Sequence, residues 1–238
     1  MRVVQDIWHG ESSELGKRFL AKRMVQCVIT DPPFGVDNQS NSSVTPDGKK
    51  YARKIMNDES PEIAMASFEK VMGTIIPAMK DDSDIYVFTA HQVLEEWLEF
   101  TRILFQPFGF TRKAIGMWIK DGPGQGDLQT WGMGCEFILY YKRGKRPGNG
   151  KRTNLIFNES QVRPNKLIHP HEKPLELLWK LAQHSTNPGD LLVDPYGGSG
   201  SLARMCRLHE RSGVSIEGDE YNFQLAKQAL EEMEVPLI

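Results

Sequence analysis

The sequence predicts an α/β fold in which helices cover both faces of a mixed, mostly parallel sheet. The first observation is the run Met24–Ile29, which is mostly apolar, as in a central strand buried on both faces. The second is the C-terminal third of the chain, where amphipathic helices alternate with short apolar strands. The third is a glycine-rich turn, Pro195–Gly200, between one of these strands and the next helix. This order indicates βαβ units.

The composition fits one globular domain that spans residues 1–238. Of the 238 residues, 39% are hydrophobic, which is enough to bury a core. The formal net charge of -2 provides no overall attraction for a polyanion. A nucleic-acid contact would therefore need local basic patches.

Cysteine use and hydropathy indicate a soluble cytoplasmic protein without a membrane segment. Cys27, Cys135 and Cys206 lie far apart, which argues against a disulfide framework or a zinc cluster. The N-terminus lacks the apolar core of a signal peptide, and no apolar run approaches the roughly 18 residues of a membrane span.

Five elements are predicted in the N-terminal half of the chain. Val3–Trp8 and Met24–Ile29 have the apolar character of strands. Pro61 marks the first turn of a helix, because the apolar residues after it follow helical spacing. Asp84–Thr89 is then predicted as a strand and His91–Leu104 as a helix.

The middle of the chain combines two strands with two long polar segments. The predicted strands, Phe110–Ile119 and Cys135–Tyr141, flank a glycine-rich loop. The polar segments, 35–60 and 142–168, are too long to be simple connections. They carry Lys49, Lys50, Arg53 and Lys54 in the first, and Arg143, Lys145, Arg146, Lys151 and Arg152 in the second. Charge alone favours a solvated face over nucleic-acid binding.

The C-terminal part is more regular. Pro174 begins a helix, and Leu191–Asp194 is the strand that follows it. The helix after Gly200 is amphipathic, Val214–Glu217 is the next strand, and a final helix starts near Glu220.

A strand, a glycine turn, a helix and a strand that ends in a carboxylate form a nucleoside-binding unit. Glu217 lies about 20 residues after Gly197, the spacing at which an acidic residue meets a ribose in such folds. Gly197, Gly198 and Gly200 allow a sharp turn and a close approach of a ligand to the main chain. On the glycines alone, a purely structural strand-to-helix turn stays open as the alternative.

The order of the elements places the end of the Met24–Ile29 strand beside this unit. Few residues follow Glu217, whereas an ordinary dinucleotide-binding fold has several more strands at that point. Strands from the N-terminal part must therefore complete the sheet. If these strands are parallel to it, Asp31 lies at the same edge as the glycine turn, where open α/β sheets bind ligands.

The segment Asp31-Pro32-Pro33-Phe34 offers groups that suit chemistry on the amino group of a base. An exocyclic amine is a poor nucleophile because its lone pair is delocalised into the ring. The Asp31 carboxylate and the Pro32 carbonyl, stiffened by two proline rings, could each accept one of its N–H bonds. Phe34 could stack on a flipped base. The alternative is a proline turn with a capping Asp31 and a core Phe34.

These motifs resemble those of the S-adenosylmethionine-dependent amino-methyltransferases that modify adenine N6 or cytosine N4 in DNA. Asp31–Phe34 matches the catalytic D-P-P-Y/F motif, and Asp194–Gly200 matches the D-P-F-x-G-S-G loop. His169–Pro174 resembles the H-P-T-Q-K-P segment, and Glu11 stands where the family usually has Asp. The motif order is that of the permuted class, in which the catalytic motif comes first. The resemblance therefore implies a circularly permuted, Rossmann-like class I methyltransferase fold.

The resemblance also implies roles for individual residues. Asp31, Pro32, Pro33 and Phe34 would be catalytic. The cofactor would be S-adenosylmethionine, and no metal is expected. The residues implied to bind the cofactor are Glu11, Asp31, Lys173, Asp194, Tyr196, Gly197, Gly198, Ser199, Gly200, Ser201 and Glu217.

Double-stranded DNA is the implied partner. The chain has no separate target-recognition domain, so the segments 35–60 and 142–168 are expected to contact the DNA. The resemblance is also consistent with a homodimer. It is consistent both with a cognate restriction endonuclease and with an orphan enzyme that lacks one.

The expected reaction is site-specific methylation of adenine N6 in duplex DNA by base flipping. In the resembling family, Asp at the first motif position mostly accompanies adenine, and N4-cytosine methylation is the alternative. An RNA adenine methyltransferase and a catalytically silent nucleic-acid-binding partner subunit also stay open. A nicotinamide oxidoreductase that uses Gly198-x-Gly200-x-x-Ala203 would leave Asp31–Phe34 and His169–Pro174 unexplained.

Overall fold

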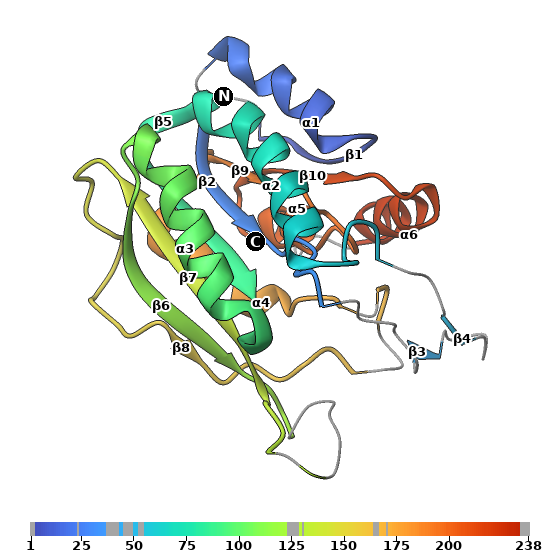
Figure 1. The fold of residues 1–238 in the computed structure, drawn as a ribbon. Helices are drawn as coiled ribbons and strands as arrows, with labels where there is room; N and C mark the ends of the chain where they lie inside the picture. The colour runs from blue at the N-terminus through green and yellow to red at the C-terminus, as the bar shows by residue number, and fades with distance from the viewer. Residues whose placement is uncertain are drawn as a thin grey trace.

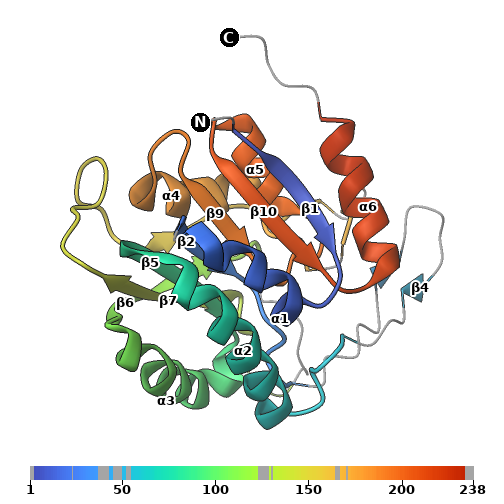
Figure 2. The same ribbon diagram turned by 90° about the horizontal axis from the view of Figure 1, so that it is seen from above.

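The chain forms a central sheet with helices on both faces (Figures 1 and 2). The computed structural model describes residues 3–22, 24–36, 43–44, 50–51, 55–122, 129, 131–163, 167–169 and 171–233. The described strands of the main sheet have the order β1-β10-β9-β2-β5-β7-β6-β8. Their bounds are β1 Gln5–His9, β2 Val25–Thr30, β5 Met79–Thr89, β6 Thr111–Ile119, β7 Cys135–Arg143, β8 Ile156–Phe157, β9 Leu191–Asp194 and β10 Ser212–Glu217.

The sheet is mixed and mostly parallel, as the sequence predicts. β7 pairs antiparallel with β5 and with β6, and the other pairs in this sheet are parallel. β3 (Ser43–Val44) and β4 (Lys50–Tyr51) form a separate antiparallel pair.

Two helical layers sandwich the sheet, as Figure 2 shows most clearly. Residues of α2 and α3 pack into a core on one face, and residues of α4 and α5 pack into a core on the other. α6 packs with α5 and β1 at the β1 side. The helices are α1 Ser12–Leu15, α2 Pro61–Ile75, α3 Leu94–Phe105, α4 Leu175–Ser185, α5 Ser201–Leu208 and α6 Glu220–Glu231. Short 3-10 turns cover Gly16–Lys22, Ile76–Ala78, His91–Val93 and Gln106–Phe108.

The start of α2 illustrates how the sequence determines a helix. Pro61 occupies the first turn, where its missing N–H costs nothing, and the Ser60 side chain accepts a hydrogen bond from Ile63 N at 3.4 Å. Its buried residues lie at helical spacing, so one stripe faces the sheet. They are Ala64, Phe68, Val71, Met72 and Ile75.

The pairing of β2 with β9 positions the functional site. The two strands run parallel, with Val28 opposite Val193. Asp31 and Asp194 therefore come at the same edge of the sheet, and Thr30 Oγ1 donates to Asp194 Oδ1 at 3.0 Å. This confirms the prediction that strands from the N-terminal part complete the sheet beside the glycine turn.

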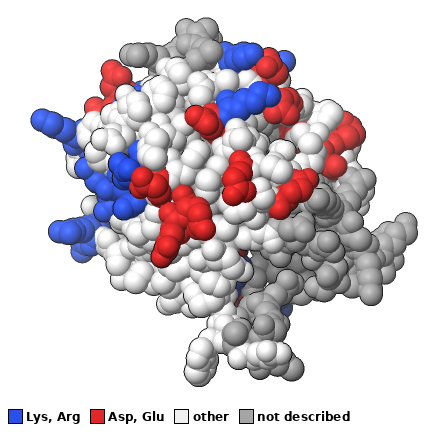
Figure 3. Space-filling view, viewed as in Figure 1, with Lys and Arg blue, Asp and Glu red and all other residues white. Residues whose placement is uncertain are grey.

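The surface has distinct charged regions. In Figure 3, Asp and Glu side chains gather over α2 and α3, while Lys and Arg gather along the flank where β6 lies. The acidic face over α2 and α3 is poorly suited to a polyanion. Among the described helices, none has the length and apolar character that a membrane span requires.

Candidate active site

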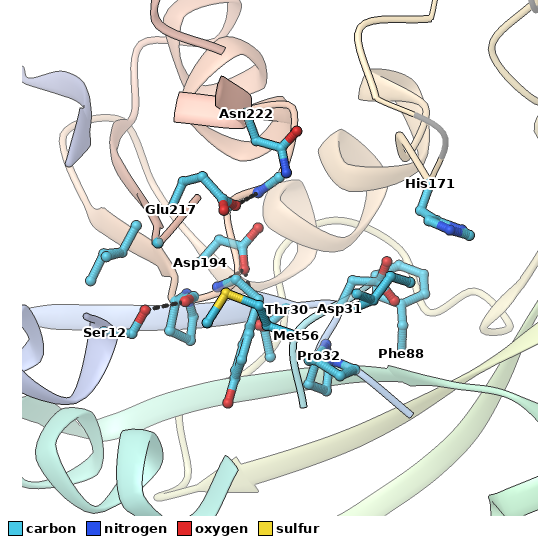
Figure 4. Close-up of a pocket in the computed structure, with 18 of the residues that line it drawn as sticks. Ser12, Thr30, Asp31, Pro32, Met56, Phe88, His171, Asp194, Glu217 and Asn222 are labelled. Atoms are coloured by element: carbon cyan, nitrogen blue, oxygen red, sulfur yellow. Dashed lines mark hydrogen bonds between the residues drawn. The ribbon is translucent and has the colours of Figure 1, made fainter. Parts of the chain in front are cut away.

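A pocket with a cavity of about 250 Å³ opens at the carboxyl ends of β2, β9 and β10. Its lining comes from segments far apart in the sequence: Gly10–Ser12, Asp31–Phe34, residues 55–58, Pro195–Ser199 and Glu217–Asp219. Figure 4 shows two groups of side chains. Glu217, Asp194 and Asn222 lie on one side, and Asp31, Phe88 and His171 lie on the other.

The glycine turn forms the floor of the first side. Gly198 and Gly200 have φ angles of 49° and 70°, in the left-handed region that favours glycine. A Cβ on Gly200 would lie 2.5 Å from Ile7 Cδ1, so a larger residue would have to displace that side chain in addition to adopting a strained φ. Gly197 N donates to Ile216 O at 2.8 Å and ties the turn to β10. Ser199 and Ser201, both predicted to bind the cofactor, bond to each other through their hydroxyls at 2.7 Å.

Glu217 closes this side at the end of β10. Its carboxylate accepts backbone hydrogen bonds from Gly198 N at 2.7 Å and from Asp219 N at 2.8 Å. Burial raises the pKa of Glu217, although these hydrogen bonds oppose the shift. The Glu217 carboxylate is thus held against the glycine turn, as its spacing from Gly197 predicts.

Asp194 is more deeply buried than Glu217. Its Oδ1 accepts from Thr30 Oγ1 and from Tyr196 N, each at 3.0 Å. Burial nevertheless raises the pKa of Asp194 to about 8. The hydroxyl of Tyr196 lies 3.4 Å from Ser67 Oγ, which links the turn to α2.

Glu11 lies at the rim of the same side. It precedes α1, and its carboxylate accepts a hydrogen bond from Ser13 Oγ at 3.2 Å. Ser12 Oγ donates to Pro195 O at 2.5 Å and holds α1 against the glycine turn. The sequence analysis missed this short helix, because four residues are too few to show a periodic pattern.

Four side chains of alternating charge lie in a row on the other side of the pocket. Lys173 Nζ contacts Asp31 Oδ2 and lies 3.2 Å from Glu136 Oε2. Glu136 Oε1 in turn lies 2.6 Å from Lys120 Nζ. Lys173 is only 7% exposed, and its ammonium lies 5.1 Å from the centre of the Phe88 ring. The order along the row is therefore Asp31, Lys173, Glu136 and Lys120.

The pKa values follow from burial and from this pairing. Burial raises the pKa of Asp31 to about 6, although Lys173 opposes the shift. Burial also favours neutral Glu136 and neutral Lys173, but the opposite charges prevail. The pKa of Glu136 is lowered by Lys173 and Lys120, and the pKa of Lys173 is raised by Asp31 and Glu136.

One oxygen of Asp31 remains open. Lys173 occupies Oδ2, whereas Oδ1 is buried and accepts no hydrogen bond from the part of the chain that the structure describes. A buried acceptor without a donor is costly, and a catalytic role is one explanation for such an atom. Asp31 Oδ1 is therefore an unpaired acceptor on a residue that lines the pocket.

Lys173, predicted to bind the cofactor, lines the same pocket as the glycine turn. Its ammonium lies against Asp31 and Glu136 and not against Glu217. The neighbouring Glu172 anchors the segment to α5 through Arg204, at 2.7 Å. Lys173 is therefore placed to orient and balance the charge of Asp31.

Two histidines border the Lys173 segment. Burial lowers the pKa of His169 to about 3 and that of His171 to about 4, so both are neutral at pH 7. Figure 4 shows His171 on the Asp31 side of the pocket. Across the described residues, no group of three or more His, Cys, Asp or Glu side chains could hold a metal ion.

Phe34 lines the pocket and is half-buried between the two cores. Its backbone is held on both sides: Phe34 N donates to Asp58 Oδ1 at 2.9 Å, and Phe34 O accepts from Trp97 Nε1 at 3.1 Å. Pro32 and Pro33 also line the pocket. The structure thus brings all four predicted catalytic residues to the cavity.

The structure does not bring the basic residues at the end of β7 to the pocket. Arg143 lies opposite Ser83 on β5, at the amino end of the parallel strands, and donates to Met79 O at 2.7 Å. Arg146 contacts buried Asp84 at 3.0 Å, and Lys145 N donates to Asp82. These contacts give Arg143 and Arg146 structural roles, whereas the resemblance implied that they contact DNA. Two further residues of this segment, Lys151 and Arg152, are exposed.

The remaining predicted DNA contacts cannot be placed. Lys49, Arg53 and Lys54 lie outside the described residues, as does the side chain of Lys50.

Sequence reasoning missed Glu136, Lys120 and Asp58. Glu136 lies in a predicted strand and Lys120 follows another, but a charge near a strand end usually faces solvent. Asp58 belongs to a polar segment that resembled an ordinary loop. A carboxylate at the start of an otherwise apolar strand, as in Cys135–Arg143, is the signal that could have found Glu136.

A family model described as DNA methylase (N6_N4_Mtase) matches residues 25–228, which is most of the chain. The chain belongs to this family. Among curated proteins similar to this chain, the Type II methyltransferase M.HpaI of Haemophilus parainfluenzae is 36% identical over 67 residues, 28% of this chain and 21% of that protein. M.HhaII of Haemophilus parahaemolyticus is 28% identical over 131 residues, 47% of this chain and 57% of that protein. The chain thus spans less than two thirds of either relative.

Solved structures share the fold along nearly the whole chain. An M1.HpyAVI–SAM complex aligns with a TM-score of 0.69 at 22% identity, covering 96% of this chain and 99% of that chain. The cytosine-N4-specific PvuII DNA methyltransferase aligns with a TM-score of 0.71 at 15% identity, covering 98% and 88%. TTHA0409 of Thermus thermophilus, complexed with S-adenosyl-L-methionine, gives 0.64 at 18% identity, covering 99% and 96%. At these identities, the likeness is one of fold.

Proposed function

We propose that the chain is a DNA methyltransferase that transfers a methyl group from S-adenosylmethionine to N6 of adenine in duplex DNA, after the base is flipped out of the helix. The observation that carries the proposal is the open Oδ1 of Asp31, a buried acceptor in the pocket that also contains the glycine turn. Family membership supports the reaction class.

The first side of the pocket fits S-adenosylmethionine. The left-handed backbone of Gly198 and Gly200 leaves room for a ligand to approach the main chain. Glu217 is suited to accept a hydrogen bond from a ribose hydroxyl, and the acids of the pocket favour a positively charged ligand. When bound, S-adenosylmethionine supplies an electrophilic methyl group on a positively charged sulfur.

The Asp31 side would activate the amino group of the base. Asp31 Oδ1 accepts one N–H of the amine, and the Pro32 carbonyl accepts the other, so that the lone pair is localised and aimed. Positive charge develops on the amine during transfer, and the Asp31 carboxylate stabilises it. Lys173 fixes Oδ2, which keeps Oδ1 directed to the pocket.

Proton removal and base binding use the same residues. A carboxylate with a pKa of about 6 can take the proton that the methylated amine releases and pass it to water. The Phe34 ring lines the pocket and would stack on the flipped base, an interaction of about 1–3 kcal/mol. Enclosure of the amine between Phe34 and Asp31 excludes water from the reacting atoms.

Adenine is proposed over cytosine because Asp31 opens the motif, as it mostly does in relatives that modify adenine. The test incubates the protein with methyl-labelled S-adenosylmethionine and unmethylated duplex DNA of mixed sequence, and then digests the DNA to nucleosides. Label in N6-methyl-2′-deoxyadenosine is the expected result. Label in N4-methyl-2′-deoxycytidine would overturn the base assignment, and label only on RNA offered in parallel would overturn the DNA assignment.

A further inference from the structure

The chain makes an unusually tight turn directly after Phe34. Gly35 has a φ of 84°, and a Cβ on it would lie 2.3 Å from Pro61 N at the start of α2. Only glycine fits this close approach. The turn directs the backbone N–H groups of Phe34, Gly35 and Val36 toward a common point.

The Asp58 carboxylate occupies that point. Its Oδ1 accepts hydrogen bonds from Phe34 N at 2.9 Å, Gly35 N at 2.7 Å and Val36 N at 3.4 Å. Successive N–H groups that converge in this way form a concavity that binds anions. Asp58 is 3% exposed, so it supplies a buried negative charge where these buried donors need one.

The carboxylate is 24 residues from Phe34 in the sequence, so this contact is not a local turn. Phe34 is held at its carbonyl as well, by Trp97 Nε1 at 3.1 Å. The peptide units on both sides of Phe34 are therefore fixed. Because the φ angles of Pro32 and Pro33 are locked, fixing the backbone of Phe34 also restricts the position of the Pro32 carbonyl and of the Asp31 backbone.

We propose that Asp58 is a positioning residue for methyl transfer: it holds the Asp31–Phe34 segment in the conformation that presents its acceptors to the target amine. The inference rests on the proposed function. In this role, Asp58 does not contact the substrate. This role also implies that loss of Asp58 lowers the transfer rate far more than it weakens cofactor binding, since the N–H groups bound to its Oδ1 belong to residues 34–36.

The test compares wild type, Asp58→Ala and the milder Asp58→Asn, which keeps one acceptor oxygen. Asp190→Ala is the matched control. Asp190 also accepts a backbone hydrogen bond, from Asn187 N at 2.9 Å, but it precedes β9 at the opposite edge of the sheet. Hydrogen exchange of the amides of residues 34–36 is measured by mass spectrometry, and single-turnover methyl transfer to DNA and cofactor affinity are measured on the same preparations.

For Asp58→Ala we expect exchange at residues 34–36 to accelerate about 10- to 100-fold, and the transfer rate to fall by a similar factor. Cofactor affinity should change less than about threefold, Asp58→Asn should fall between wild type and Asp58→Ala, and Asp190→Ala should change neither exchange nor rate. Unchanged exchange would overturn the contact itself. Faster exchange with an unchanged rate would overturn the positioning role. If exchange accelerates in Asp58→Ala but the wild-type protein methylates no DNA, the contact of Asp58 with residues 34–36 is supported and the proposed function is contradicted.

Discussion

The β9–β10 side of the pocket is centred on the glycine turn and Glu217, which are close in the sequence, whereas the Asp31 side gathers its charges from four separate segments. On the first side, Glu217 accepts from the backbone N–H groups of Gly198 and Asp219, and Asp194 accepts from Tyr196 N and from the Thr30 hydroxyl. On the second, Asp31 is bound by Lys173, which is 142 residues away, and Glu136 by Lys120 across two strands. A buried charge that depends on distant side chains is sensitive to the loss of one of them.

This difference makes Lys173→Met the most damaging substitution that we predict. Lys173 separates the Asp31 and Glu136 carboxylates, and its removal leaves two buried acids without their common partner. Breaking a buried ion pair typically costs about 3–5 kcal/mol. Urea unfolding should show a loss of that size.

Lys180→Met is the matched control. Lys180 pairs with Glu159, but its side chain is 39% exposed. Such a pair is worth roughly 0–1 kcal/mol. If Lys180→Met and Lys173→Met lower the free energy of unfolding equally, burial of the charges on the Asp31 side does not increase their contribution to stability.

On the other side of the pocket, Glu217→Gln should weaken cofactor binding and leave the transfer rate nearly unchanged. The amide keeps one acceptor for the backbone but loses the charge that meets a ribose hydroxyl. We expect cofactor affinity to fall about 10- to 100-fold and the transfer rate at saturating cofactor to stay within a few-fold of wild type. Titration calorimetry gives the affinity. A large fall in the saturated rate, with affinity intact, would contradict the division between the two sides.

The same division explains what could be predicted from the sequence. The glycine turn and Glu217 form a local motif, so their positions followed from spacing alone, and Asp31 followed because β2 must join the same sheet. The role of Lys173 could not follow, because its partners lie on β7 and after β2. The resemblance implied that Arg146 contacts DNA, but Arg146 pairs with buried Asp84, a contact that no local pattern shows.

The pH dependence of transfer should report Asp31. Its pKa is raised to about 6, so the carboxylate that accepts the amine is ionised above that pH and protonated below it. The single-turnover rate should be constant above about pH 7 and fall about tenfold per unit below pH 6. Cofactor binding at each pH separates this effect from unfolding. A rate that stays constant down to about pH 4.5 would indicate an ordinary carboxylate.

The effect of Asp194→Asn should depend on pH. Because the folded pKa is raised to about 8, the folded protein holds a proton that the unfolded chain releases between about pH 4 and pH 8. The contribution of Asp194 to stability therefore falls as pH rises through that range. Asparagine can accept the same bonds from Thr30 and Tyr196 without this loss. Melting temperatures should be similar near pH 4, and the variant should become progressively more stable than wild type as the pH rises toward 8.5. A variant that is much less stable at both values would show that Asp194 is ionised in the fold.

The most direct measurement is single-turnover methyl transfer to DNA by Asp31→Ala at saturating S-adenosylmethionine, with cofactor affinity determined on the same preparation. If the open Oδ1 is the acceptor for the target amine, the rate should fall by about 10²- to 10³-fold while affinity stays within about threefold of wild type. A rate close to that of wild type would contradict the account, because the reaction would then proceed without the oxygen on which it rests.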